Sequence, residues 1–442
     1  MQWRAMDVPD WMARGLRGAP HTGDAELSGA RWSVKYRIVE VEVGRRRIGL
    51  QLDVEESGVA VVMRNRGNPV GFAMLDLQHG ASVDAACVER TVSLATAATI
   101  LRAALRDELS PAAPTGPLPS LTLAICTKDR PDLVARCLGS VEQVRRTSSH
   151  RDVLLEVLVI DNAPSDDRTA TLVETFPWAR RCLDSREGLD FARNTAWREA
   201  RGDFVAYLDD DAVLDAGWLD GFVDAWRRHQ DAGAFTGLVL PFSLETEAQI
   251  LFERRGGFGR GFVSQRFTDG DLDENPCYPT GAGSFGAGCN MILRRELLHR
   301  IGGFDEALDT GAPLPGGGDL DIFYRVIRSP APLVYEPRLL VFHEHRRTMP
   351  GLRRQYYTWG LGFMAFVAKT WNSDKAQRSK LLKLLVWWTT DQLKAVADGV
   401  FRRGVRRFDH TIAELCGGII GLMGTYSRSR RRSARIRAAH QQ

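Results

Sequence analysis

The chain is organised around the stretch Phe204-Val-Ala-Tyr-Leu-Asp209-Asp210-Asp211-Ala-Val-Leu214. Its first five residues are apolar or aromatic, which predicts a buried strand. Three carboxylates follow where that strand should end. Adjacent like charges repel and are costly to bury, so they are tolerated on a solvated turn or around a bound cation. An acidic turn is the commoner meaning of an isolated Asp-Asp-Asp, but this strand is too apolar for a surface edge.

The position of this acidic triplet favours a ligand site. Open α/β sheets bind ligands at the carboxyl ends of their strands. Carboxylate oxygens suit Mg²⁺ or Mn²⁺, and such ions commonly bridge substrate phosphates. We therefore predict a metal–diphosphate site after Leu208.

Length and charge suggest several parts. At 442 residues the chain is too long for one ordinary core. The formal net charge is only +4, but from Arg346 onward 20 Lys and Arg stand against 5 Asp and Glu. This basic tail on an acidic body predicts an anionic partner for the tail.

The cysteines and the hydropathy indicate the cellular compartment. Seven cysteines are scattered without a Cys-x-x-Cys pair, which argues against a disulfide framework and a structural zinc site. No apolar run reaches the roughly 18–20 residues that span a bilayer, and the first residues lack the form of a signal peptide. We expect a cytoplasmic protein.

The spacing of apolar residues divides the chain. Between Tyr36 and Leu77, short stretches of period two predict an antiparallel sheet of about four strands, and a helix is expected over residues 86–109. Farther on, strands alternate with helices, which predicts right-handed parallel crossovers and an α/β fold with a doubly wound, mostly parallel sheet. The expected parts are a β-rich accessory module (1–110), a Pro-rich linker (111–120), the α/β domain (121–345) and a helical, basic C-terminal extension (346–442).

Other polar residues near strand ends are candidates for the same site. Asp161 follows an apolar strand, where it could bind a ribose hydroxyl or a base N–H, or cap the next turn. Arg193 and Asn194 lie on the helix before the central strand, where they could face phosphates or solvent. The Gly-rich loops Gly256–Gly261 and Pro279–Gly288 are not Walker loops, and we expect them to be mobile loops over a pocket.

Two later motifs carry further carboxylates and histidines. Asp319 opens a helix after a run of glycines, where a carboxylate can act in catalysis or simply cap the helix. Asp321 lies two residues on and does not share its helix face. His343 and His345 flank Glu344, a combination that is a better metal candidate than a lone histidine.

Together these motifs resemble family 2 glycosyltransferases of the GT-A fold, from about Leu121 to about Trp371. The motifs that carry the resemblance are Thr127-Lys-Asp129-Arg130-Pro131, Val159-Ile-Asp161-Asn162, Ala192-Arg193-Asn194, Leu208-Asp-Asp-Asp211, Gly302-Gly-Phe-Asp305-Glu306, Gly317-Gly-Asp319 and His343. Each motif is modest, but their common order makes the match specific.

The resemblance implies roles for the matching residues. Asp209 and Asp211 match the DXD pair that binds the ribose and the metal, Mn²⁺ or Mg²⁺, and His343 matches a histidine that completes the metal or diphosphate contacts in some members. Asp319 matches the general base; the family's preceding Glu is Gly318 here, which leaves Asp321 as a substitute. The nucleotide-sugar site would comprise Thr127, Asp129, Arg130, Asp161, Arg193, Asn194, Asp209 and Asp210.

The leading hypothesis is therefore a metal-dependent, inverting glycosyltransferase that moves a sugar from a nucleoside-diphosphate donor, with a UDP-sugar favoured, to a hydroxyl acceptor. An inverting transfer needs a base within reach of the acceptor hydroxyl and no covalent nucleophile. The alternatives are a nucleotidyltransferase, whose Gly-rich signature Thr127–Pro131 fits poorly, and a degenerate, membrane-associated scaffold. The sequence leaves the sugar, the acceptor and the role of the accessory module open.

Two interpretations of the C-terminal extension are open. Aromatic and apolar helix faces flanked by arginines suit peripheral attachment to the inner face of the membrane. Glycines interrupt these faces, which favours a helical cap packed on the α/β domain. No nucleic-acid-reading motif accompanies the charge, so we expect no nucleic-acid partner.

Overall fold

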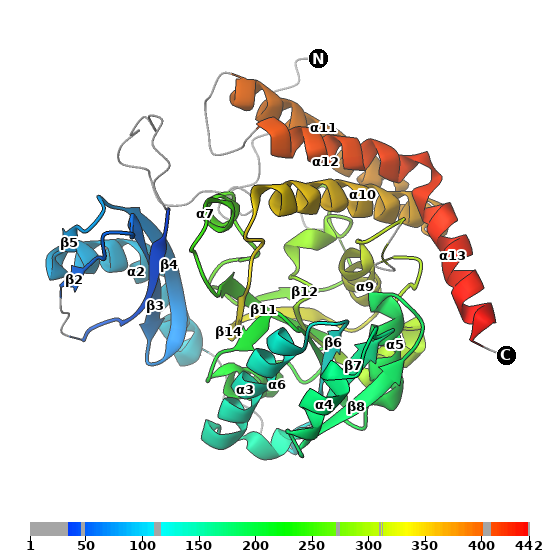
Figure 1. The fold of residues 1–442 in the computed structure, drawn as a ribbon, viewed down its shortest axis with the longest axis horizontal. Coiled ribbons are helices and arrows are strands. Elements are labelled where there is room, and N and C mark those ends of the chain that lie inside the picture. Colours follow the sequence, from blue (N-terminus) through cyan, green and yellow to red (C-terminus); the bar gives the residue numbers. More distant parts are fainter. Residues whose placement is uncertain are drawn as a thin grey trace.

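The computed structural model describes residues 34–45, 49–109, 116–270, 275–308, 311, 313–400 and 408–440. Figure 1 shows a small N-terminal module, a central domain built on one large sheet, and a layer of C-terminal helices. Residues 1–33, and residues 110–115 of the expected linker, lie outside the described residues.

The N-terminal module is built from short strands and one long helix. Its elements are β1 (Tyr36–Glu42), β2 (Leu50–Gln51), β3 (Gly58–Asn65), β4 (Asn68–Asp76), β5 (Ser82–Val83) and α2 (Ala85–Leu109). The expected four-stranded antiparallel sheet is wrong in two respects: β1 pairs with β3 in parallel, and β2 pairs only with β5. Parallel neighbours need a crossover of a dozen or more residues, and residues 43–57 supply one between β1 and β3.

The central domain contains one mixed, mostly parallel sheet. Its strands are β6 (Leu121–Thr127), β7 (Leu154–Asn162), β8 (Ala179–Asp184), β9 (Phe204–Asp209), β10 (Ala212–Leu214), β11 (Ala234–Pro241), β12 (Gln265–Phe267), β13 (Asn290–Arg294) and β14 (Leu333–His343). They lie in the order β10-β14-β11-β13-β9-β6-β7-β8, with β12 beside β14. β8, β7, β6 and β9 are mutually parallel, whereas β13 is antiparallel to both of its neighbours. The predicted α/β fold class is confirmed.

Helices cover both faces of this sheet. They are α3 (Pro131–Thr147), α4 (Arg168–Glu174), α5 (Leu189–Glu199), α6 (Trp218–Arg228), α7 (Glu247–Arg254), α8 (Arg295–Ile301) and α9 (Gly318–Ile327). Along β6, Leu123 packs in the core with α3 and α6, and its neighbour Ala124 packs in the core with α5, α8 and α9. Because both faces are buried, the parallel strands are continuous apolar runs.

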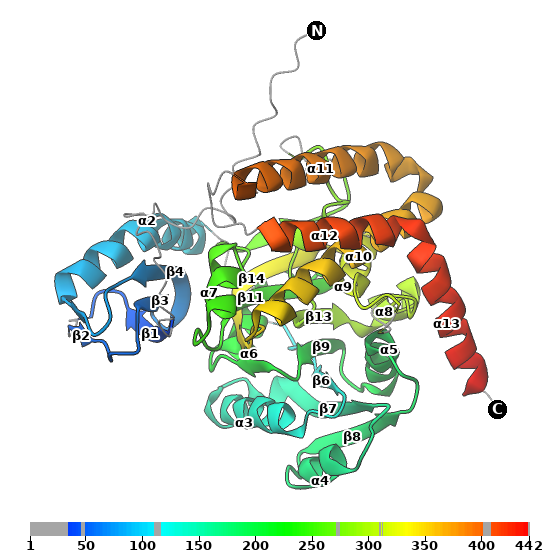
Figure 2. The same cartoon turned by 45° about the horizontal axis from the view of Figure 1, so that its top comes forward.

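The C-terminal helices form a layer over one end of the central domain. They are α10 (Met349–Ser373), α11 (Arg378–Val400), α12 (Phe408–Ile420) and α13 (Tyr426–Ala439). Figure 2 shows α13 turning away from this layer and running beside α5. Two ion pairs attach it, Arg432 to Glu187 and Arg437 to Glu306, each at 3.0 Å. Among the described helices, none is long and apolar enough to cross a membrane.

Glycines let α10 and α12 approach closely. A Cβ atom added to Gly417 of α12 would lie 2.0 Å from the carbonyl oxygen of Tyr357, and one added to Gly360 of α10 would lie 2.0 Å from that of Glu414. The glycines that interrupt the apolar faces are therefore the points where the two backbones touch.

We expect Gly417→Ala to lower the free energy of unfolding by about 1–3 kcal/mol, the usual cost of inserting a methyl group into packed structure. The new methyl would push α10 and α12 apart, and urea unfolding would measure the loss. Gly139→Ala is the matched control, because Gly139 is exposed on α3 with nothing within 4 Å of an added Cβ. It should be neutral or stabilising by up to about 1 kcal/mol. Equal stability of the two variants would contradict the close packing.

Candidate active site

The acidic triplet lies at the carboxyl end of the central strand. Residues Phe204–Leu208 of β9 are buried between β6 and β13, and Asp209 is the last residue of the strand. Asp210 and Asp211 form the turn into β10 and are each only 4% exposed. This turn lies beside the ends of β6 and β14, so side chains from distant parts of the chain meet there.

Asp210 is held by the loop after β6. Its carboxylate accepts a hydrogen bond from Oγ1 of Thr127 at 2.7 Å and pairs with Nη1 of Arg130 at 2.6 Å. Burial raises the pKa of Asp210 to about 7 despite the opposing charge of Arg130. The second carboxylate, Asp211, pairs with Nη2 of the same arginine at 3.0 Å. Thr127 and Arg130 thus contact the triplet directly, as expected for residues of one site.

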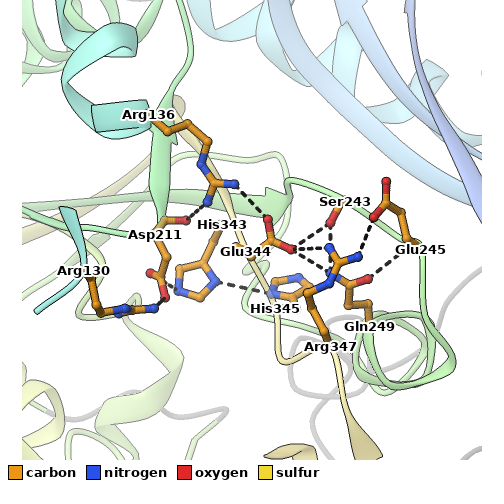
Figure 3. Close-up of polar contacts among 10 residues, drawn as sticks. All are labelled: Arg130, Arg136, Asp211, Ser243, Glu245, Gln249, His343, Glu344, His345 and Arg347. Atoms are coloured by element: carbon orange, nitrogen blue, oxygen red, sulfur yellow. Dashed lines mark hydrogen bonds and ion pairs between the residues drawn. The ribbon is translucent and has the colours of Figure 1, made fainter. Parts of the chain in front are cut away.

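Two histidines lie at and just beyond the end of β14, with 3.4 Å between their Nδ1 atoms, and Figure 3 shows His343 facing Asp211. Nε2 of His343 lies 3.1 Å from Oδ1 of Asp211, whereas Nε2 of His345 lies 2.6 Å from Glu253. Glu344 points toward Arg136, at 3.0 Å. The three residues of the predicted metal motif therefore point to different partners, and of its two histidines His343 faces the acidic triplet. Burial acts to raise the pKa of Asp211, but His343 and Arg130 hold that pKa below its ordinary value.

The site also contains a cysteine that the sequence analysis missed. Ligand atoms of Asp209, Cys289 and His343 lie within 4.8 Å of one another. Cys289 immediately precedes β13, which pairs antiparallel with β9 so that Asn290 lies opposite Leu208. This register brings Cys289 to the end of β9, a placement that an unaligned sequence does not reveal. Burial and the nearby carboxylates raise the pKa of the Cys289 thiol well above its ordinary value.

These residues fit a divalent cation. Oδ1 of Asp211 is buried and has no hydrogen-bond partner among the described residues, although Nε2 of His343 is close. No described residue forms an ion pair with the carboxylate of Asp209. Carboxylates in a buried cluster are costly without enough opposite charge, and a cation between Asp211, Asp209 and His343 would supply that charge.

Asp319 lies near this cluster, whereas Asp321 does not belong to it. An atom at the Cβ position of Gly288, next to Cys289, would lie 3.1 Å from Cβ of Asp319. Oδ1 of Asp319 accepts the amide hydrogen of Leu320, and its carboxylate forms no ion pair with any described residue. The carboxylate of Asp321 is buried, 2.5 Å from Nζ of Lys369 and 2.7 Å from Arg325. Asp321 thus ties α9 to α10.

Arg260 is a further cation near Asp319. Arg260 donates hydrogen bonds to the carbonyl oxygens of Gly283 at 2.8 Å and Gly259 at 3.1 Å, and it pairs with no carboxylate in the described ranges. Burial lowers the pKa of its guanidinium, while Tyr335, Asp319 and Cys289 oppose that shift. The two glycine-rich loops expected over a pocket are therefore joined by this arginine.

The other predicted nucleotide-site residues surround the triplet in different ways. Asp161 lies opposite Thr127 in the sheet and pairs with Arg181 at 2.8 Å, while its buried Oδ1 has no hydrogen-bond partner in the described structure. Arg193 lies beside Gly288 and pairs with Asp190 at 3.1 Å. Burial raises the pKa of Asp209, and Arg193 is among the cations that oppose this shift.

Two of the predicted residues have contacts that shape loops. Asn194 accepts the amide hydrogen of Phe304 at 2.8 Å and donates to its carbonyl at 2.9 Å, which fixes the loop after α8. Asp129 has a positive φ of 55° and accepts the amide hydrogen of Ser165 at 2.7 Å. In the described part of the chain, neither side chain forms a hydrogen bond or an ion pair with the acidic triplet.

Comparison with known proteins assigns the class. Residues 122–302 match the model described as Glycosyl transferase family 2. This segment contains the acidic triplet and Cys289, and it ends before Asp319 and His343. The similarity to glycosyl transferase family 2 thus lies in this segment, and it confirms the resemblance.

Individual relatives are more distant. The pre-mycofactocin glycosyltransferase of Mycobacterium tuberculosis (strain ATCC 25618 / H37Rv) is 28% identical over 221 residues, 45% of this chain and 44% of that protein. The O-antigen biosynthesis protein RfbC of Myxococcus xanthus is 24% identical over 67% of this chain and 24% of its own length. The chain thus spans less than half the length of these relatives. A mannosyltransferase from Pyrobaculum calidifontis, solved with GDP-Man and Mn²⁺, aligns with 77% of this chain and 92% of its own at 18% identity and a TM-score of 0.44.

Proposed function

We propose that the chain transfers a sugar from a nucleoside-diphosphate donor to a hydroxyl acceptor, with inversion and with the help of a divalent cation. One observation carries this proposal: an acidic cluster with a facing histidine lies at the carboxyl ends of parallel strands, and the carboxylate of Asp319, without an ion pair to any described residue, lies beside it. The acidic cluster would act on the leaving diphosphate, and Asp319 would act on the attacking hydroxyl.

The donor would lie across the ends of β6, β7 and β9. The free Oδ1 of Asp161 can accept a hydrogen bond from the nucleotide, and Asp209, Asp211 and His343 would hold Mn²⁺ or Mg²⁺ at the diphosphate. A divalent ion held there would neutralise the charge that develops on the leaving diphosphate. Arg260 supplies a guanidinium without a carboxylate partner in the described structure, and it can add to this stabilisation.

The acceptor would bind on the Asp319 side of the cluster. Asp319 removes the proton from the acceptor hydroxyl, and the hydroxyl oxygen bonds to the anomeric carbon. The bond from that carbon to the diphosphate oxygen breaks at the same time, so the nucleoside diphosphate leaves and the configuration inverts. The acceptor is unassigned, because it is set by loops whose sequence varies independently of the fold.

Calorimetric titration of the full chain with UDP, GDP, CDP and dTDP, each with and without Mn²⁺, tests the donor site. We expect one nucleotide to bind in a Mn²⁺-dependent manner, with UDP favoured. The heat of Mn²⁺ binding alone is the control for non-specific effects. If none of the four nucleotides binds with or without Mn²⁺, the proposed function is wrong.

A further inference from the structure

The one group in the cation cluster that the family comparison does not account for is the thiol of Cys289. Cys289 is 5% exposed, and its sulfur lies within 4.8 Å of the ligand atoms of both Asp209 and His343. The register of β13 against β9 fixes this position, because Asn290 opposite Leu208 places the preceding residue at the end of the acidic strand. Cys289 is thus positioned by the sheet and not by a loop alone.

A second observation points to a ligand between these groups. Oδ1 of Asp211, a residue that is 4% exposed, lies 3.1 Å from Nε2 of His343 and meets no other polar partner among the described residues. Three atoms bound to one ion at about 2.0–2.3 Å lie roughly 3.3–4.0 Å from one another. The three side chains would therefore move closer together when they close on a cation.

We propose that Cys289 binds the divalent ion as a thiolate, together with Asp209 and His343, and that the site consequently prefers a borderline ion such as Zn²⁺ or Co²⁺ to Mg²⁺. This inference rests on the proposed function, because it concerns the same cation. The thiol gives up its proton when the ion binds, as metal-ligating cysteines do.

Ligand chemistry is the reason for the expected preference. Mg²⁺ demands oxygen ligands in a nearly octahedral arrangement, whereas thiolate and imidazole suit softer ions. A thiolate and an imidazole beside the carboxylates of Asp209 and Asp211 match the second group better than a site of oxygen ligands alone would. The competing interpretation is that Cys289 is only a small apolar residue in the core, as buried free cysteines commonly are. The two interpretations differ in whether sulfur is bonded to the ion.

Cobalt-loaded protein distinguishes them without any measurement of activity. Wild type titrated with Co²⁺ should develop a thiolate-to-cobalt charge-transfer band that saturates at one ion per chain. Cys289→Ser should lose this band and bind Co²⁺ at least about 10-fold more weakly, since even outer-shell changes cost 10–100-fold in metal affinity. Cys126→Ala is the matched control, because Cys126 is another thiol whose pKa Asp209 and Asp210 raise, and this variant should keep the band.

Two further measurements complete the test. X-ray absorption at the cobalt edge of wild type, which needs no variant, should show one sulfur ligand. A 100-fold excess of Mg²⁺ should fail to displace Co²⁺, whereas Zn²⁺ should displace it. Stoichiometric Co²⁺ binding without a sulfur ligand, or displacement by equimolar Mg²⁺, would overturn the inference.

Failure of this inference and failure of the proposed function look different. Mn²⁺-dependent nucleotide binding without a cobalt–thiolate band would remove Cys289 from the ligand set and leave the transferase proposal intact. A clear thiolate band without binding of any nucleotide would support the ligand assignment and reject the transferase.

Discussion

Asp319→Asn is expected to lower the rate of nucleoside-diphosphate release from the donor by about 10²–10⁴-fold, the usual contribution of a general base. The amide cannot take up the proton of the acceptor hydroxyl. Its shape is otherwise that of the carboxylate, and it can still accept the amide hydrogen of Leu320. The donor identified by calorimetry should therefore bind to the variant with nearly unchanged affinity.

Asp321→Asn is the matched comparison on the same helix. The carboxylate of Asp321 is 1% exposed and pairs with both Lys369 and Arg325, so replacing it removes one partner from each of these half-buried cations, while Lys369 keeps Asp305 at 2.9 Å. Leaving such a group without its partner costs about 1–3 kcal/mol of stability. We expect Asp321→Asn to unfold at lower urea concentration, while its folded fraction keeps the wild-type rate. If Asp321→Asn lowered the rate as much as Asp319→Asn does and left unfolding unchanged, Asp321 would be the general base and Asp319 the structural residue.

The sequence predicted the central domain well because its signals are local. β6 to β9 are short apolar runs separated by helices with one apolar face, and both features follow from burial on the two faces of a sheet. The position of the acidic triplet at a strand end followed from the same pattern. His343 was placed in the site through the family resemblance, and the structure shows it facing Asp211.

The errors arise where pairing is non-local. Nothing in β1 or β3 distinguishes parallel from antiparallel pairing, and β2 is only two residues long. The sequence does not predict Cys289 as a site residue, because its position next to Asp209 depends on the register of two strands that are far apart in sequence. The different partners of His343, Glu344 and His345 depend likewise on which neighbours surround the end of β14.

The second large effect is expected for Asp211→Asn, which should abolish the Mn²⁺ dependence of nucleotide binding. Asp211 offers a buried oxygen whose partner among the described residues is the imidazole of His343, and His343 and Arg130 keep the pKa of Asp211 below its ordinary value, so it is ionised at neutral pH. An amide carries no charge and is a weaker ligand for a hard cation. The loss should be at least as large as the 10–100-fold cost in metal affinity of changing an outer-shell partner.

Asp210→Asn provides the contrast that makes this result specific to Asp211. Burial raises the pKa of Asp210 to about 7, so an uncharged amide is a smaller change for Asp210 than for Asp211, whose pKa is lowered. The hydroxyl of Thr127, which donates to Asp210 at 2.7 Å, can turn to accept a hydrogen from the new amide. Asp210→Asn should therefore change Mn²⁺-dependent nucleotide affinity only a few-fold in calorimetry. If the two variants lose Mn²⁺ dependence equally, the cation is not held by Asp211 in particular, and the triplet acts through its summed charge.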